Sequence, residues 1–352
     1  MQLPRRQPAP NRRHFAAGMG LAAAVLAVPA LRAQSRPDKS RVVISVGKKA
    51  SFFHLPLTIA EQLGYFQAEG LDVEIVDFGS GINALQAIAA GVADVCAGSF
   101  MHTVSLQSKE RFFRAFVMQG RAPQVVTAVS ARTMPHYHGI DDLRGRRIGI
   151  SAVGSATNMA ASLLLAHGGV RADEVSFVDV GTGAEALHAL RSGQIDAISN
   201  VDPLITQLEQ KGDVRIISDT RTLKGTQEVF GGPLPAACLY AQEDFVQKHA
   251  NTVQALANAM VHGLKWLQTA GPADIVKTVP ERYLLGDRAL YLASFEKVRE
   301  AISPDGLVPD DGPRTAVRAA ALFEPGLKPE KIVPARLFTN DFARRAKQKF
   351  QA

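Results

Sequence analysis

Short turns rich in small residues precede two predicted helices and could bind an anion. The first turn is Gly79-Ser80-Gly81, and the second is Gly154-Ser155 with Thr157 two residues later. Backbone N–H groups at a helix start have no partner within the helix, and the helix dipole favours negative charge there. Serine and threonine hydroxyls add donors, although such residues also serve as ordinary helix caps. We expect a ligand to contact both turns, through Ser80, Gly81, Gly154, Ser155 and Thr157.

Other candidate ligand contacts come directly after predicted strands. In open sheets of parallel strands, ligands bind beyond the carboxyl ends of the strands. The strands predicted at 41–47, 94–98 and 195–199 place six further residues at such ends: Phe53, His54, Gly98, Ser99, Asn200 and Asp202. Alternatives are a core position for Phe53, a helix-entry position for His54, and a capping role for Asp202 at the helix that begins at Pro203.

One stretch of the chain occurs twice, at a constant offset of 102 residues. The identical positions include Asp77 and Asp179, Gly79 and Gly181, Gly81 and Gly183, Gly91 and Gly193, and Asp94 and Asp196. Each copy has the pattern of a strand, a glycine turn, a helix and a second strand, which is a βαβ unit. Solenoid repeats are shorter, roughly 20 to 50 residues. Unless the match is a coincidence between ordinary βαβ units, it predicts an α/β protein with two similar doubly wound lobes and a ligand cleft between them.

The first 33 residues have the order of an export signal peptide. They contain five arginines and no acidic residue, an apolar run over 15–31 and a small residue at Ala33. The pair Arg12-Arg13 fits a twin-arginine signal, and a general secretory signal remains the alternative. Removing this segment lowers the formal charge from +7 to +2, so a nucleic-acid partner is not expected. We expect a soluble, monomeric periplasmic protein.

Catalytic and metal-binding patterns are missing from the sequence. No Gly-x-Ser-x-Gly, His-Glu-x-x-His or P-loop motif is present. The pair His136 and His138 has no acidic or cysteine partner at suitable spacing and is expected in a solvated loop. Cys96 and Cys238 lie in buried-strand patterns, so two separate thiols are favoured over a disulfide. We expect no catalytic residue, no metal and no cofactor.

Several segments together resemble a known family. They are Leu63-Gly64-Tyr65-Phe66, Glu69-Gly70-Leu71-Asp72-Val73-Glu74 and Asp142-Leu143-Arg144-Gly145-Arg146-Arg147-Ile148-Gly149. The chain is similar over roughly residues 42–240 to periplasmic substrate-binding proteins of ABC importers, in the group of sulfonate, taurine, nitrate and pyrimidine-precursor binders. The resemblance implies the type II periplasmic-binding-protein fold, in which two crossing segments join two lobes around a small ligand.

The expected domain organisation follows from this resemblance. Lobe 1 covers 41–120 and is completed by part of 241–340, and lobe 2 covers 121–240. The crossings are expected near 118–129 and 234–240, and a helical wrap with a solvated basic tail covers 241–352.

The implied function is capture of a small anion (sulfonate, carboxylate or nitrate-like) and delivery to an ABC permease and ATPase complex in the inner membrane. Alternatives are a ligand-binding sensor for a membrane signalling protein and a thiamine-pyrimidine-related protein. That last branch depends on a cysteine-rich motif, which this sequence lacks.

Overall fold

The computed structural model describes residues 36–284, 286–324 and 326–352. The predicted export signal therefore lies outside the described residues. Within the described ranges, no helix combines the length and the apolar character needed to cross a membrane. Residues Arg36–Ala352 form a single structural unit.

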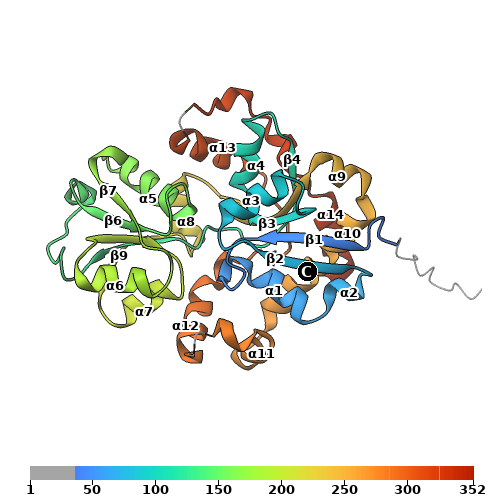
Figure 1. Cartoon of the computed structure of the whole chain (residues 1–352), viewed down its shortest axis with the longest axis horizontal. Helices are drawn as coiled ribbons and strands as arrows, with labels where there is room; N and C mark the ends of the chain where they lie inside the picture. Colours follow the sequence, from blue (N-terminus) through green and yellow to red (C-terminus); the bar gives the residue numbers. More distant parts are fainter. Residues whose placement is uncertain (1–35, 285, 325) are drawn as a thin grey trace, which may run out of the picture. The chain divides into compact units, whose positions relative to one another are not determined.

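The strands form two five-stranded mixed sheets (Figure 1). The first sheet has the order β2 (Asp72–Asp77), β1 (Arg41–Val46), β3 (Val95–Ser99), β10 (Ala237–Gln242) and β4 (Phe113–Met118). The second has the order β7 (Ser176–Asp179), β6 (Arg147–Ile150), β8 (Ala197–Asn200), β5 (Val126–Ser130) and β9 (Val214–Asp219). In both sheets the first three strands are parallel, and the fourth is antiparallel to both of its neighbours.

The repeat found in the sequence is a structural repeat. Gly79 and Gly181 both adopt left-handed backbone conformations, with φ of 75° and 66°, which glycine adopts without steric cost. The repeated aspartates also make the same contact, because each accepts a hydrogen bond from a backbone amide at the start of the neighbouring strand. The distances are 3.0 Å from Val43 N to Asp94 Oδ2 and 3.1 Å from Arg147 N to Asp196 Oδ2.

The two crossings are shorter than expected. Residues 126–130 form β5 in the second sheet, and residues 237–242 form β10 in the first, so the crossings are limited to 119–125 and 231–236. Along the chain, the second sheet therefore begins with β5. An apolar run alone does not say which sheet a strand joins, because it is buried in either case.

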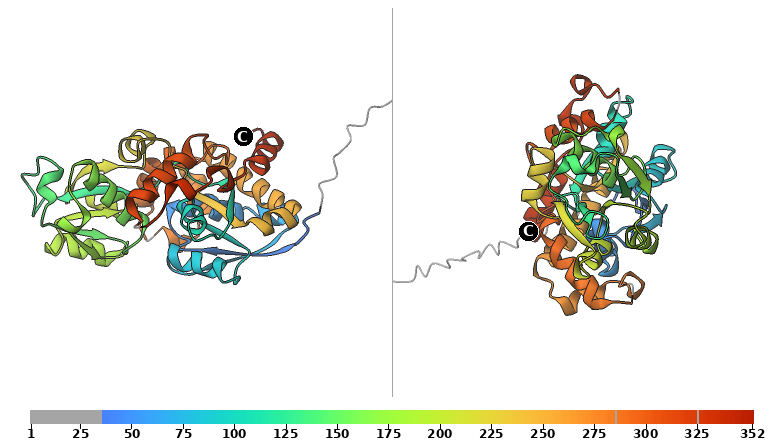
Figure 2. Two further views of the ribbon diagram at one scale, coloured as in Figure 1. Left: turned by 90° about the horizontal axis from the view of Figure 1, so that it is seen from above. Right: turned by 90° about the vertical axis from the view of Figure 1, so that its left-hand side faces the viewer.

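Helices surround both sheets (Figures 1 and 2). Around the first sheet and between the sheets they are α1 (Leu55–Gln62), α2 (Tyr65–Ala68), α3 (Gly81–Ala89), α4 (Met101–Gln107), α9 (Glu243–Lys248), α10 (Ala250–Thr269), α11 (Pro272–Thr278), α12 (Arg288–Val298), α13 (Gly312–Phe323) and α14 (Asp341–Phe350). The second-sheet segment adds α5 (Ala156–His167), α6 (Ala184–Ser192), α7 (Leu204–Gln210) and α8 (Leu223–Phe230). Short 3-10 helices cover Phe52–His54, Ile140–Leu143, Ala172–Glu174, Glu281–Tyr283, Arg299–Ala301, Pro329–Lys331 and Pro334–Arg336.

The basic end of the chain is helical, unlike the solvated tail that we expected. Helix α14 buries Phe342, Ala343 and Ala346 in the core that it shares with α10. Its basic residues remain on the outer face, where Lys347 pairs with Asp305 at 2.7 Å. The charges in the sequence therefore mark one face of an amphipathic helix.

One apolar cluster joins the two halves of the fold. It contains Phe100 and Val104 from the first half, Met159 and Leu163 of α5 from the second, and residues of α13 such as Ala316. The C-terminal helices thus share a core with both segments, and the two crossings are not the only physical connection between the lobes.

The end of β1 lies against the turn that precedes α3. A Cβ atom on Gly47 would lie 2.2 Å from the carbonyl carbon of Ser80 and 2.3 Å from the nitrogen of Gly81. The Asp77 carboxylate holds the adjoining loops together, because it accepts from the amides of Lys48 at 2.9 Å, Lys49 at 2.8 Å and Gly79 at 2.9 Å.

Substituting Gly47→Ala must therefore move backbone at the start of α3. We expect the free energy of unfolding, measured by urea titration, to fall by about 1 to 3 kcal/mol. The control is Gly139→Ala, which has extended backbone and open space around the new methyl group, and should change stability by no more than about 1 kcal/mol. Equal stability of the two variants would contradict the close approach.

Candidate functional site

The start of α3 has free backbone donors. Ser80 is the N-cap, and its Oγ accepts from Asn83 N at 3.2 Å. The amides of Gly81 and Ile82 donate to no acceptor among the described residues, and both residues are exposed. Ser80 therefore acts as a cap, and the first two amides of the helix remain available to an anion.

His54 is buried close to this helix start. Its side chain is 4% exposed, and its Nδ1 has no partner in the described structure. Burial lowers the pKa of His54 to about 4, although the nearby Asp77 carboxylate and the Gly47 carbonyl favour the charged form. The imidazole is therefore neutral at pH 7, with a buried nitrogen that no described group satisfies. Phe53 is half-buried, and its ring meets the His54 ring edge-on, with centroids 5.2 Å apart.

His102 in α4 belongs to the same region, and the sequence analysis did not select it. Its Nδ1 lies 2.9 Å from the Tyr240 hydroxyl, and a Cβ atom on Gly81 would lie 3.8 Å from its Cε1. Burial lowers the pKa of His102 to about 4, so this imidazole is also neutral at pH 7. Its place in the first turn of the helix that follows Ser99 was the only signal in the sequence.

Gly98 and Ser99 have structural roles at the end of β3. Gly98 is buried beneath neighbouring side chains, including those of His102 and Tyr240. Ser99 is half-buried, and its Oγ accepts from Met101 N at 3.2 Å. Both residues shape the position of α4 and its histidine.

In each half of the fold, we call the carboxyl ends of the parallel strands and the turns that follow them the rim. The start of α5 lies on the rim of the second half and corresponds to the start of α3 on the first. The hydroxyls of Ser151, Ser155 and Thr157 form a triangle with oxygen–oxygen distances of 2.8 to 3.0 Å. Ser155 is the N-cap, and Thr157 Oγ1 also accepts from Ser151 N at 2.9 Å. The amides of Ala156 and Thr157 donate to no described acceptor. Gly154 is exposed at this turn with a left-handed φ of 78°.

Asn200 and Asp202 are buried and use their polar atoms within the protein. Asn200 Nδ2 donates to the Gly181 carbonyl at 2.8 Å, which connects the end of β8 to the second glycine turn. Asp202 Oδ1 accepts from Thr206 N at 2.8 Å, and its Oδ2 pairs with Arg221 at 3.0 Å. The Asp202 carboxylate thus stabilises the first turn of α7 and neutralises a buried arginine.

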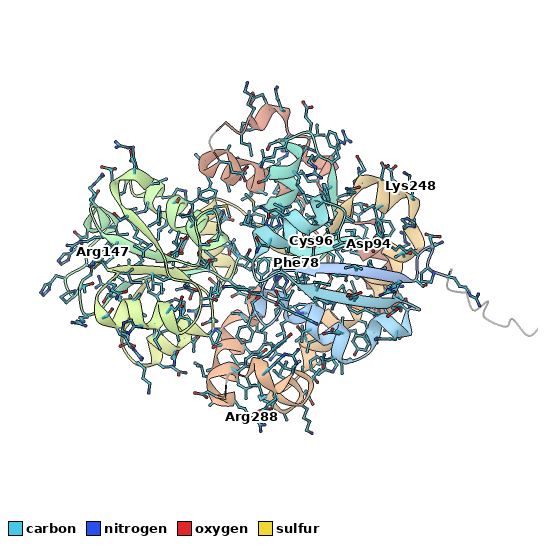
Figure 3. The ribbon with its side chains drawn as sticks, in the orientation of Figure 1. Phe78, Asp94, Cys96, Arg147, Lys248 and Arg288 are labelled. Carbon is cyan, nitrogen blue, oxygen red and sulfur yellow. The ribbon has the colours of Figure 1, made fainter. Side chains whose placement is uncertain are left out.

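Lys48 connects the two rims. Its Nζ donates to Thr182 Oγ1 at 2.9 Å, and Thr182 lies in the second glycine turn. Desolvation lowers the pKa of Lys48, while the Asp77 carboxylate opposes this shift. In Figure 3, Asp94 and Arg147, at the amino ends of β3 and β6, lie far apart, with the strand carboxyl ends between them. Lys48 therefore brings a positive charge between the rims.

Apolar side chains lie next to these polar groups. Phe78 and Val201 are half-buried and pack against the cluster that contains Phe100. Val153, beside the α5 turn, is 70% exposed. The region combines amide and imidazole donors with apolar surface.

Two surface cavities lie elsewhere. They have volumes of about 310 and 360 Å³ and lie beside Ser130 and Gln242, the last residues of the antiparallel strands β5 and β10. Because β5 and β10 run antiparallel to the other strands, their carboxyl ends lie beside the amino ends of the parallel strands, away from the rims. Among the residues that the structure describes, no group of three or more His, Cys, Asp or Glu could hold a metal ion.

Comparison with protein families identifies the chain. Residues 51–272, more than half of the 352 residues, match the family described as NMT1/THI5 like. The chain belongs to the NMT1/THI5-like family.

Solved structures share the fold of this NMT1/THI5-like chain. A protein from Bordetella bronchiseptica RB50 is 53% identical, with a TM-score of 0.84 over 90% of this chain and 99% of that chain. The alkanesulfonate-binding protein SsuA from Xanthomonas axonopodis pv. citri, solved bound to MOPS, is 16% identical, with a TM-score of 0.64 over 86% and 99% of the chains. The periplasmic nitrate-binding protein NrtA from Synechocystis PCC 6803 is 13% identical, with a TM-score of 0.67 over 90% of each chain. The predicted two-lobe α/β fold is confirmed.

Sequence relatives include binding proteins and an enzyme. YtlA of Bacillus subtilis (strain 168), named as a binding protein, is 20% identical over 73% of this chain and 76% of its own length. The 4-amino-5-hydroxymethyl-2-methylpyrimidine phosphate synthase of Schizosaccharomyces pombe is 20% identical over 63% of this chain and 64% of its own length. Sequence relatives of this chain thus include both kinds of protein.

The buried His54 predicts acid sensitivity of this NMT1/THI5-like fold. Its folded pKa of about 4 lies below the usual 6.5, so the unfolded state takes up the proton first as the pH falls. Above pH 6.5, His54 is neutral in both states and does not reduce the free energy of unfolding. As the pH falls from 6.5 towards 4, protonation of His54 in the unfolded state lowers the free energy of unfolding. When the pH is lowered from 7 to 4.5, the free energy of unfolding should fall less in His54→Gln than in the wild type, by up to about 2 to 3 kcal/mol.

Urea unfolding at both pH values measures this difference. His188→Gln, at an exposed position in α6, controls for loss of an imidazole and should behave like the wild type. Equal acid sensitivity of wild type and His54→Gln would show that the His54 imidazole is not buried in neutral form.

Proposed function

We propose that the protein captures a small organic anion in the periplasm and delivers it to an ABC permease. The observation that carries the proposal is the pair of helix starts, α3 and α5, each with two free amides, on rims that Lys48 and Thr182 connect. Free amides at helix starts and an ammonium group suit a negatively charged group.

The apolar surroundings favour an organic anion over a purely inorganic one. Phe78, Val201 and the exposed Val153 provide surface for a short hydrocarbon portion. Such a ligand would place its charged group at the amides and its hydrocarbon portion against these side chains. An alkyl sulfonate or carboxylate has this character.

Cysteine chemistry gives no support to an enzymatic role. Cys96 and Cys238 are free, fully buried thiols. Burial raises the pKa of Cys96 to about 11 and raises the pKa of Cys238 well above its usual value. Neither thiol is a nucleophile at neutral pH, because nucleophilic attack requires the thiolate.

Thermal unfolding with ethanesulfonate, MOPS, acetate and nitrate tests the proposal. A ligand that binds only the folded state raises the midpoint, and a concentration of about 100 times Kd adds roughly 2.7 kcal/mol. We expect ethanesulfonate to raise the midpoint, and Ser155→Asp to weaken its binding more than tenfold in calorimetry. The reason is that an acidic group is placed at the anion site, while aspartate still caps the helix.

The control for this variant is Gln242→Asp. This substitution also places an aspartate at a helix N-cap, that of α9. Because Gln242 ends β10 on the side of the first sheet away from the rims, ligand binding should be unchanged. The anion proposal fails if no probe raises the midpoint. The α5 site fails if folded Ser155→Asp binds like the wild type.

Contact with both rims predicts closure of the lobes on the ligand. A ligand that touches both rims binds the closed form better and shifts the population towards it. Small-angle X-ray scattering should show a smaller radius of gyration with saturating ethanesulfonate, and no change for Ser155→Asp at the same concentration. An unchanged wild-type curve under saturation would mean that binding occurs without closure.

A further inference from the structure

Three side chains meet above Gly98 in the first sheet. A Cβ atom on this glycine would lie 3.2 Å from Cys96 Sγ, 3.2 Å from His102 Nδ1 and 3.3 Å from Tyr240 Cε1. Tyr240 and Cys96 are direct partners across the β10–β3 pair. The absence of a side chain at Gly98 leaves the space in which the tyrosine from β10 reaches the histidine from α4.

The direction of the hydrogen bond between Tyr240 and His102 follows from their chemistry. The tyrosine is fully buried and its hydroxyl lies 2.9 Å from His102 Nδ1. The neighbouring Cys96 sulfur is only a weak acceptor, whereas a neutral imidazole nitrogen is a strong one. Burial raises the pKa of Tyr240 well above its usual value, so the phenol keeps its proton. The phenolic O–H therefore donates to Nδ1.

This direction decides which nitrogen of His102 carries the proton. A neutral imidazole has one N–H group, and an Nδ1 that accepts a hydrogen bond leaves the proton on Nε2. Nε2 bonds to no described residue. The ring carbon between the two nitrogens, Cε1, faces Gly81 at the start of α3, because it would lie 3.8 Å from a Cβ atom on that glycine.

We propose that Tyr240 is a positioning residue that fixes His102 in the Nε2–H tautomer, which adds a third donor beside the free amides of Gly81 and Ile82. The donor role of Nε2–H towards a bound anion rests on the proposed function. The tautomer itself does not, because the contact with Tyr240 exists without a ligand.

Long-range proton–nitrogen NMR spectra of the ligand-free protein test the tautomer directly. At pH 7, the His102 signals, assigned by their loss in His102→Gln, should show Nε2–H in the wild type. Tyr240→Phe removes the donor and should convert His102 to a mixture of tautomers. Tyr291→Phe removes another buried hydroxyl, in a separate core cluster, and should leave the His102 spectrum unchanged.

Binding measurements test the consequence. With ethanesulfonate as the probe, Tyr240→Phe should weaken binding by roughly three- to tenfold, as expected for impairment of one hydrogen bond to a charged group. In the His102→Gln background, where an amide replaces the imidazole and has no tautomers, Tyr240→Phe should have little further effect. This non-additivity distinguishes positioning from a general structural loss.

The outcomes separate this inference from the proposed function. An Nδ1–H tautomer in the wild type overturns the inference, and that spectrum requires no variant to fold. An unchanged tautomer in folded Tyr240→Phe also overturns it. Absence of ethanesulfonate binding with the Nε2–H tautomer intact would overturn the proposed function and the ligand role of Nε2–H, but not the effect of Tyr240.

Discussion

The carboxylate of Asp77 holds the first rim together. It accepts from the amides of Lys48 and Lys49 after β1 and of Gly79 after β2, so one side chain fixes two loops. One loop carries Lys48 and leads to His54, and the other positions the start of α3. Among the residues that the structure describes, no carboxylate has this role at the second rim. There the Ser151, Ser155 and Thr157 hydroxyls bond to one another, and Thr157 Oγ1 accepts from Ser151 N, which connects the end of β6 to α5. The two lobes share a fold but stabilise their rims by different chemistry.

The donors at the two rims do not form a cluster of positive charges. The two buried imidazoles are neutral at pH 7, and Lys48 is held between the Asp77 carboxylate and Thr182. Most of the available donors are backbone amides, whose directions the fold fixes. Such groups need little rearrangement to receive an anion, because the fold has already oriented them.

Sequence patterns predicted the fold well because they are local. The glycines at 79 and 181 mark turns whose backbone conformation glycine favours, and the apolar spacing identifies the strands and helices around them. The role of His102 and the ion pair of Asp202 could not be predicted in this way, although the capping role of Asp202 was one of the expected alternatives. His102 depends on Tyr240, which comes 138 residues later, and Asp202 is neutralised by Arg221 from the end of a different strand. Lys48 was missed because its partner, Thr182, lies in the other lobe.

The late position of β10 along the chain has a consequence for the order of folding. The second sheet takes all of its strands from one continuous stretch, from Val126 to Asp219. The first sheet lacks its fourth strand until Gln242 is available, and until then β3 and β4 have no partner between them. Pairing across so many residues costs more chain entropy than local pairing and is slower. The lobe that begins first along the chain is therefore the last that can be completed.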